Sequence, residues 1–114
     1  MRLARGRITN RNEFSTNSRP LRGQRVMQTR AITIINPLGL HGRAAAKLVT
    51  LCTRFQSRVE LVVNGRRANG RRFIALIMLS ASMGAKVNIE VTGPDEARAL
   101  TAVTRLISSG FGEG

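Results

Sequence analysis

A hairpin signal at Asn64 and Gly65 constrains the fold of this chain more than any other feature. Three apolar residues alternate with other side chains immediately before it: Val59, Leu61 and Val63. An Asn-Gly pair supplies the left-handed backbone that a two-residue hairpin turn requires, and residues 66–68 can return as a second strand. The sequence therefore predicts two antiparallel strands that are neighbours in one sheet.

Two further segments are predicted as strands. Residues 31–35 are short and β-branched and are followed by turn chemistry over residues 36–39. Residues 87–91 alternate apolar Val87, Ile89 and Val91 with polar residues. Each pattern is typical of a strand with one buried face.

Helical spacing appears twice. After His41, one apolar stripe follows positions i, i+3, i+4 and i+7: Ala45, Leu48, Val49 and Cys52. A last helix opens at residues 93–96 with a proline and two acids, buries Leu100, Val103 and Ile107, and ends at Gly110. Residues 73–79 are apolar all round, so periodicity alone assigns them to neither helix nor strand.

Composition limits what the chain can do. Its 114 residues are enough for one domain with a modest core, and no apolar run approaches the roughly 20 residues that span a bilayer. We therefore expect a soluble, cytoplasmic protein without membrane insertion. Cys52 lies on an apolar helix stripe and is predicted to be a buried free thiol rather than a metal ligand. No metal and no cofactor is expected.

Positive charge is concentrated at the N-terminus. Residues 1–26 hold seven of the 19 Lys and Arg residues and a single acid, Glu13, in a polar, aperiodic sequence. This composition predicts a disordered basic arm. Arginine-rich segments with few acids are typical of organelle transit peptides and of arms that bind nucleic acid. A wrongly assigned start codon is the explanation we prefer, because a chain beginning at Met27 would have 88 residues. We expect the folded domain to be residues 27–114.

The only histidine, His41, is placed where the loop after the first strand becomes a helix. A neutral imidazole is a competent nucleophile at cytoplasmic pH, since its unperturbed pKa is roughly 6.5. The first N–H groups of a helix have no internal partner and favour anions, so a phosphoryl group on His41 would meet backbone donors. Arg43 can bring a planar fork of donors to the same oxygens. From spacing alone, a lone histidine here is more often a tolerated capping or surface residue.

The segment around His41 resembles the active-site signature of the HPr family, the histidine phosphocarriers of the phosphoenolpyruvate-dependent phosphotransferase system. That signature reads Gly-Leu-His-Ala-Arg-Pro/Ala-Ala, and five residues match it by position: Gly39, Leu40, His41, Arg43 and Ala45. Gly42 occupies the small-residue position, and the resemblance extends over about residues 30–112. Ala44 stands where sugar-transport members usually carry proline, which resembles the nitrogen-related branch often called NPr.

The resemblance implies a fold and a function. It favours a short helix at residues 73–79, so the order becomes β-α-β-β-α-β-α: an α+β open-faced sandwich with a four-stranded antiparallel sheet and three helices on one face. It implies that Nδ1 of His41 accepts a phosphoryl group from phosphorylated Enzyme I and passes it to a histidine of an Enzyme IIA-type protein, with Arg43 stabilising the transferred charge. Such a protein is a carrier, expected to be a monomer, rather than a turnover enzyme.

A docking surface is predicted beside His41. Phe73 and Ile74 can form an apolar patch flanked by Arg71 and Arg72, suited to acidic partners. With Gly42 and Ala46 of the first helix, these residues form the expected partner-binding set: Gly42, Ala46, Arg71, Arg72, Phe73 and Ile74. The competing interpretation makes Phe73 and Ile74 ordinary core. Many family members carry a regulatory serine at the position of Arg72, so that control is not expected here.

Two other functions fit parts of the sequence. A small basic nucleic-acid-binding module would use the arginine arm and two arginine pairs, Arg66-Arg67 and Arg71-Arg72. The chain has no Trp or Tyr and no base-reading motif, which argues against it. The same order of elements also occurs in RNA-binding ferredoxin-like folds, so fold alone does not assign function. A purely regulatory relative that is never phosphorylated would not need both His41 and Arg43.

Overall fold

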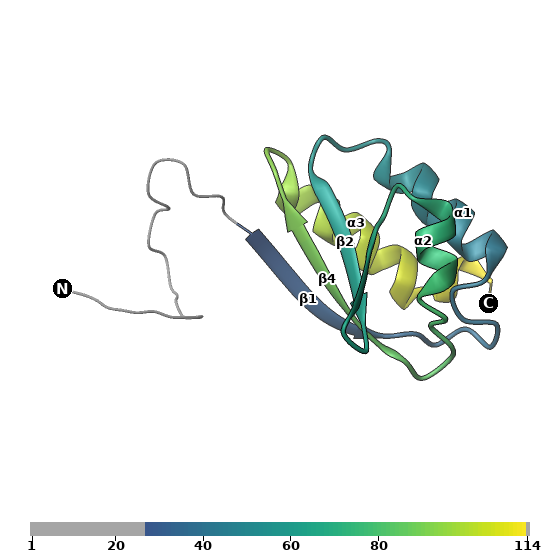
Figure 1. Cartoon of the computed structure of the whole chain (residues 1–114). Coiled ribbons are helices and arrows are strands. Elements are labelled where there is room, and N and C mark those ends of the chain that lie inside the picture. The colour runs from purple at the N-terminus through teal and green to yellow at the C-terminus, as the bar shows by residue number, and fades with distance from the viewer. Residues whose placement is uncertain (1–26, 114) are drawn as a thin grey trace.

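The computed structural model describes residues 27–113, and the predicted N-terminal arm, residues 1–26, lies outside them (Figure 1). The four strands are β1 (Met27–Thr33), β2 (Arg58–Val63), β3 (Arg66–Asn69) and β4 (Lys86–Thr92). The helices are α1 (Gly42–Cys52), α2 (Phe73–Met78) and α3 (Glu96–Ser108), followed by a short 3-10 turn, η2 (Gly110–Gly112). The element order matches the expected β-α-β-β-α-β-α.

The strands form one antiparallel sheet in the order β1-β4-β2-β3. Strand β1 pairs with β4 over its whole length, from Met27 opposite Thr92 to Thr33 opposite Lys86. Strand β4 also pairs with β2, so the last strand of the chain is central in the sheet. The predicted α+β fold class is confirmed.

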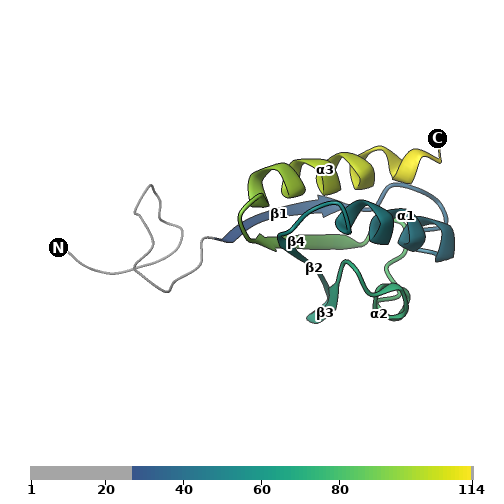
Figure 2. The ribbon, with the colours of Figure 1, turned by 90° about the horizontal axis from the view of Figure 1, so that it is seen from above.

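The helices cover one face of the sheet. Burial alternates along β2 and β4, with Val59, Leu61 and Ile89 almost fully buried between neighbours that are exposed or half-buried. Figure 2 shows α3 lying along β1 and β4, while α2 packs beside α1 and near β3. No helix among residues 27–113 covers the other sheet face, as in an open-faced sandwich.

The predicted hairpin is confirmed in detail. Asn64 and Gly65 have φ angles of 51° and 79°, the left-handed backbone expected for a two-residue turn between β2 and β3. The first strand differs from its prediction because it begins at Met27 and ends at Thr33. Pairing with β4 decides those limits. Ile34 still donates from its backbone N–H to the carbonyl of Ala85 (2.9 Å), but it has left the strand register.

Asp95, predicted to lie in the first turn of the last helix, instead ties α3 to the start of β2. Its carboxylate does not cap its own helix. It accepts hydrogen bonds from the backbone N–H groups of Gln56 (3.0 Å) and Ser57 (2.9 Å) and from the Ser57 hydroxyl. The Ser57 hydroxyl, followed by these backbone donors, holds the pKa of Asp95 below its ordinary value.

The Asp95 contact predicts a pH-dependent contribution to stability. A carboxyl group whose pKa is lower in the folded state stabilises the fold above its unfolded pKa, about 3.9, and loses that contribution as pH falls through the folded value. Asp95→Asn should therefore lower the free energy of unfolding at pH 7, and the gap from the natural chain should shrink toward pH 3. Urea unfolding at both pH values measures this.

The matched control for this prediction is Ser57→Ala, which leaves the carboxylate but removes its hydroxyl donor. In the Ser57→Ala background, Asp95→Asn should lower the free energy of unfolding by less at pH 7, and that loss should depend less on pH. The reason is that the pKa of Asp95 would move back toward its ordinary value. An Asp95→Asn gap of the same size at pH 3 and pH 7 would contradict the assignment.

Candidate functional site

The loop that carries His41 packs closely on the segment before β4. Gly39 has a φ of 65°, and a Cβ atom there would lie 2.4 Å from the carbonyl oxygen of Ala81. The next residue, Leu40, donates its backbone N–H to that same carbonyl (2.8 Å). Only glycine fits this position, since both the backbone angle and the space exclude a side chain. The loop is thereby fixed one residue before His41.

His41 is the residue that immediately precedes α1. Its backbone is extended, and its carbonyl accepts the first helical hydrogen bond, from Ala45 (2.8 Å). Its side chain does not cap the helix. The N–H groups of residues 42–44 therefore have no helical carbonyl to donate to, and they make the N-terminus of α1 favourable for an anion. The His41 side chain is 24% exposed, so a partner can reach it.

Glu113 contacts the histidine ring. His41 Nε2 forms a short hydrogen bond with Oε2 of Glu113. This bond is the main cause of a lowered Glu113 pKa, and the amide of Asn36 and the charges of His41 and Lys47 add to it. An ionised carboxylate only accepts hydrogen bonds, so Nε2 carries the ring proton. In the neutral ring Nδ1 is then the nitrogen with a free lone pair.

The segment after α3 brings Glu113 to this position. Phe111 is fully buried, with a φ of 58°, and its carbonyl oxygen accepts a hydrogen bond from Lys47 Nζ at 2.6 Å. The amide of Asn36 donates to Oε1 of Glu113 (3.1 Å). Phe111 and Glu113 were not predicted from the sequence as site residues. The available signals were an aromatic residue and an acid among glycines beyond the predicted end of the last helix.

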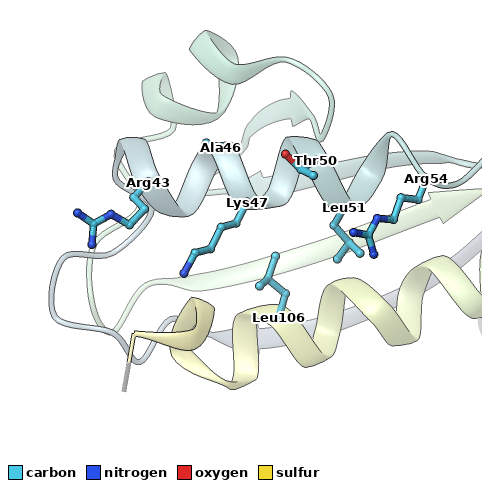
Figure 3. A pocket seen from close by; sticks show the side chains of 7 residues that line it. All are labelled: Arg43, Ala46, Lys47, Thr50, Leu51, Arg54 and Leu106. Atoms are coloured by element: carbon cyan, nitrogen blue, oxygen red, sulfur yellow. The ribbon is translucent and has the colours of Figure 1, made fainter.

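Arg43 lies in the first turn of α1 and is exposed. It lines one end of an open groove of about 420 Å³ between α1 and α3, with its guanidinium directed past the N-terminal end of the helix (Figure 3). Leu51 and Leu106 face one another across the groove (Figure 3). The predicted partner residue Ala46 lines this groove. No acidic side chain among residues 27–113 pairs with Arg43, so its charge is available to an incoming anion.

Helix α2 places apolar side chains next to the histidine loop. Phe73, Ile74 and Met78 are 40%, 67% and 64% exposed, while Leu76 points into the core. A Cβ on Gly42 would lie 3.9 Å from the ring of Phe73. The structure thus brings Phe73 beside the residue that follows His41. We refer to Phe73, Ile74 and Met78 as the α2 patch.

The two arginines predicted beside this patch lie in different surroundings. Arg71 is at the other end of α1, where its guanidinium donates to the carbonyls of Cys52 (3.3 Å) and Phe55. It satisfies carbonyls at the C-terminus of the helix, a favourable place for a cation. Arg72 precedes α2 and is exposed.

Burial raises the pKa of the Cys52 thiol to about 12, which makes it unreactive.

Residues 27–113 contain no cluster of three or more His, Cys, Asp or Glu side chains suited to a metal ion. Within the same range, no helix is both long and apolar enough to cross a membrane.

Comparison with known proteins places this geometry in a family. The family model described as "PTS HPr component phosphorylation site" matches residues 28–109, which include His41. The chain belongs to the HPr family. It is 46% identical over 88 residues to the phosphocarrier protein HPr of Cupriavidus necator, covering 77% of this chain and 99% of that protein.

Proteins named HPr and NPr are both similar to this chain. The phosphocarrier protein NPr of Escherichia coli strain K12 is 42% identical over 83 residues, covering 72% of this chain and 92% of NPr. A crystal structure of HPr-C-His from Thermoanaerobacter tengcongensis superimposes with a TM-score of 0.73 at 32% identity, over 76% of this chain and 98% of the other. The fold and family predicted from the sequence are confirmed.

The close packing of Gly39 predicts an asymmetric cost of substitution. Gly65 also has a positive φ, but a Cβ there would meet nothing within 4 Å. Gly65→Ala should cost about 1 kcal/mol of unfolding free energy through backbone strain alone. Gly39→Ala should cost about 2 kcal/mol more, because the Ala81 carbonyl must also move. Urea denaturation of both variants measures the difference. Equal losses would mean that the loop contact contributes nothing.

Gly42 shows the opposite behaviour, because neither its backbone nor its surroundings require glycine. Gly42→Ala should raise the free energy of unfolding by up to about 1 kcal/mol, since alanine loses less chain entropy on folding. Ala46→Gly is the reverse control on the same helix and should lower stability by about 1 kcal/mol. Thermal unfolding of both variants tests this, and destabilisation by Gly42→Ala would contradict it.

Proposed function

We propose that His41 is the phosphoryl-accepting residue of this HPr-family protein and that Nδ1 is the atom that forms the bond. The observation that carries the proposal is the hydrogen bond from Nε2 to Glu113 at the N-terminal end of α1. It leaves a lone pair on Nδ1 of an accessible ring, next to helix N–H groups that have no helical carbonyl. The matching family model, which is named for a phosphorylation site, supports the same residue range.

The donor in this proposal is a phosphohistidine on Enzyme I. The Nδ1 lone pair forms a bond to phosphorus while the donor's N–P bond breaks, and that electron pair returns to the donor imidazole. His41 enters the step neutral, with its proton on Nε2, and becomes a positively charged ring that carries the phosphoryl group. The Glu113 carboxylate on Nε2 stabilises that positive charge as it develops. Onward transfer to an Enzyme IIA-type histidine is the same step in reverse.

The transferred phosphoryl group needs positive charge around its equatorial oxygens. Two sources lie at the N-terminus of α1. The backbone N–H groups of the first turn are fixed in place, and Arg43 adds an exposed guanidinium without an internal ion pair in the described part of the chain. Neither requires a metal ion or a cofactor on this protein.

Partner docking is proposed at the α2 patch together with Gly42 and the exposed Arg72. Phe73 supplies an exposed aromatic surface next to the histidine loop, and Ile74 and Met78 extend it. Apolar residues with a basic rim suit an acidic partner with an apolar centre. We propose that Enzyme I and an Enzyme IIA-type acceptor use this surface in turn. Ala46, the remaining residue of the expected partner-binding set, lines the groove between α1 and α3.

The pathway branch is a separate proposal. Ala44, in place of the proline of sugar-transport members, favours the nitrogen-related branch, and relatives named HPr and NPr are similarly related to the chain. We propose that the protein acts in the cytoplasm as a monomer. The buried, unreactive thiol of Cys52 fits a reducing compartment.

The open face of the sheet does not favour the nucleic-acid alternative. On this face Arg67 is held by Glu60 (2.7 Å) and Glu90 (2.6 Å), and Arg58 pairs with Glu60 (3.1 Å). The three phenylalanines in residues 27–113 lie outside all four strands, so this face offers no aromatic platform for bases.

The decisive test of phosphorylation is incubation with purified Enzyme I, magnesium and phosphoenolpyruvate. Intact-mass analysis and phosphorus NMR should show one acid-labile phosphoryl group on the natural chain and none on His41→Ala. A circular dichroism spectrum of the variant confirms that it folds. A chain that takes up no phosphoryl group from its cognate Enzyme I would refute the proposal.

Arg43 should contribute to rate rather than to folding. Arg43→Met should slow phosphoryl transfer on the order of 10²-fold, because it removes one donor to the transition state. Arg54→Met is the matched control, since Arg54 lines the same groove from the far end of α1. Rapid-quench measurement of both rates should separate the two arginines. Equal rates for the two variants would remove Arg43 from the mechanism.

A further inference from the structure

A buried asparagine connects the loop of His41 to the carboxylate that contacts its ring. Asn36 is only 4% exposed. Its Nδ2 donates to the carbonyl of Gly39 (2.8 Å) and to Oε1 of Glu113 (3.1 Å). The other carboxylate oxygen of Glu113 accepts from His41 Nε2. One amide group therefore holds both the loop before His41 and the carboxylate that contacts the His41 ring.

The orientation of the Asn36 amide comes from its nitrogen alone. Its Oδ1 is buried and has no hydrogen-bond partner among residues 27–113. Leaving a buried acceptor unpaired costs free energy, so the unpaired Oδ1 of Asn36 destabilises the fold. The two hydrogen bonds made by Nδ2 are the interactions that offset it.

Glu113 is anchored from a second direction as well. The ring of Phe111 is fully buried, and Lys47 Nζ holds the Phe111 carbonyl (2.6 Å). These contacts fix the backbone two residues before Glu113. Asn36 then fixes the carboxylate itself, so that Oε2 faces the histidine.

We propose that Asn36 is a positioning residue that acts through Glu113 to keep the ring proton of His41 on Nε2 and so directs phosphorylation to Nδ1. The proposal rests on the proposed function of His41. Asn36 touches neither the reacting nitrogen nor the phosphoryl group. Its effect reaches the ring only through the carboxylate, in a relay of Asn36, Glu113 and His41.

The relay predicts an effect on the ring and an effect on the rate. Without the Asn36 amide, the Glu113 carboxylate is held by one side-chain donor fewer and samples positions away from the histidine. The His41 ring then carries its proton on Nδ1 for part of the time, and that form cannot attack phosphorus with Nδ1. Asn36→Ala should slow phosphoryl transfer by about tenfold.

A purely structural role would look different. Asn36 also holds the Gly39 carbonyl, so its loss could act by loosening the loop without involving Glu113. A double-mutant cycle separates the two routes. If Asn36 acts through Glu113, Asn36→Ala should have no further effect on transfer in a Glu113→Gln background. An equal slowing in both backgrounds would assign the effect to the loop.

The direct test is nitrogen NMR on protein labelled with ¹⁵N-histidine. His41 is the only histidine, so both ring-nitrogen signals belong to it, and their different couplings to the two carbon-bound ring protons distinguish Nδ1 from Nε2. In alkaline buffer, the natural chain should show a protonated Nε2 and an unprotonated Nδ1. Asn36→Ala and Glu113→Gln should both move the two shifts toward a mixture of tautomers.

Asn88→Ala is the control, because Asn88 is an exposed asparagine of β4. It should leave shifts and transfer rate unchanged. Unchanged shifts in Asn36→Ala and Glu113→Gln would overturn the relay even if His41 is phosphorylated normally. The shifts are measured without Enzyme I, so a natural chain that is never phosphorylated would refute the proposed function and leave this result readable.

Discussion

The position of His41 depends on one contact between two loops. The backbone of Gly39 lies against the Ala81 carbonyl so closely that no side chain fits between them, and Leu40 donates to that carbonyl. Residue 81 belongs to the connection that leads into β4, the central strand paired with both β1 and β2. The site is therefore fixed by the sheet register rather than by α1 alone. A helix N-terminus without this contact could turn its first residues in several directions.

Every acidic side chain in residues 27–113 has a defined partner. Glu60 and Glu90 hold Arg67 on the open face of the sheet, and Asp95 and Glu96 accept hydrogen bonds near the start of α3. Glu113 is bound to His41. The exposed Arg43 and Arg72 are left without an acidic partner in this part of the chain. The surface near His41 therefore presents positive charge to an anionic group or an acidic protein.

Local sequence patterns predicted the elements well because those patterns have local causes. The Asn64-Gly65 turn and the stripe of Ala45, Leu48 and Cys52 depend on neighbours only a few residues away. The limits of β1 were predicted less well, because pairing with β4 decides them and residues 27–30 have little apolar alternation of their own.

The histidine at the start of α1 followed from the sequence, but its contacts did not. Glu113 is 72 residues from His41 along the chain and 77 from Asn36. No periodicity or motif connects such distant positions, and only the packing of Phe111 brings Glu113 back to the loop. The guanidinium of Arg71, a predicted docking residue, donates to a carbonyl at the C-terminal end of α1, a contact that no local pattern predicted.

A phosphocarrier must release the group that it accepts. On the proposed mechanism, the Nε2 side of the His41 ring is held in place, and the Nδ1 side carries the phosphoryl group. The Nε2 side is held by a carboxylate whose own position is fixed by a buried amide. On the Nδ1 side this mechanism relies on the N–H groups of the first turn of α1 and on the exposed Arg43 rather than on a closed set of charged groups. A closed pocket that bound the phosphorylated ring as tightly as the transition state would not speed the departure of the phosphoryl group. A ring that is held firmly by Glu113, beside a phosphoryl group that is not enclosed, therefore favours transfer in both directions.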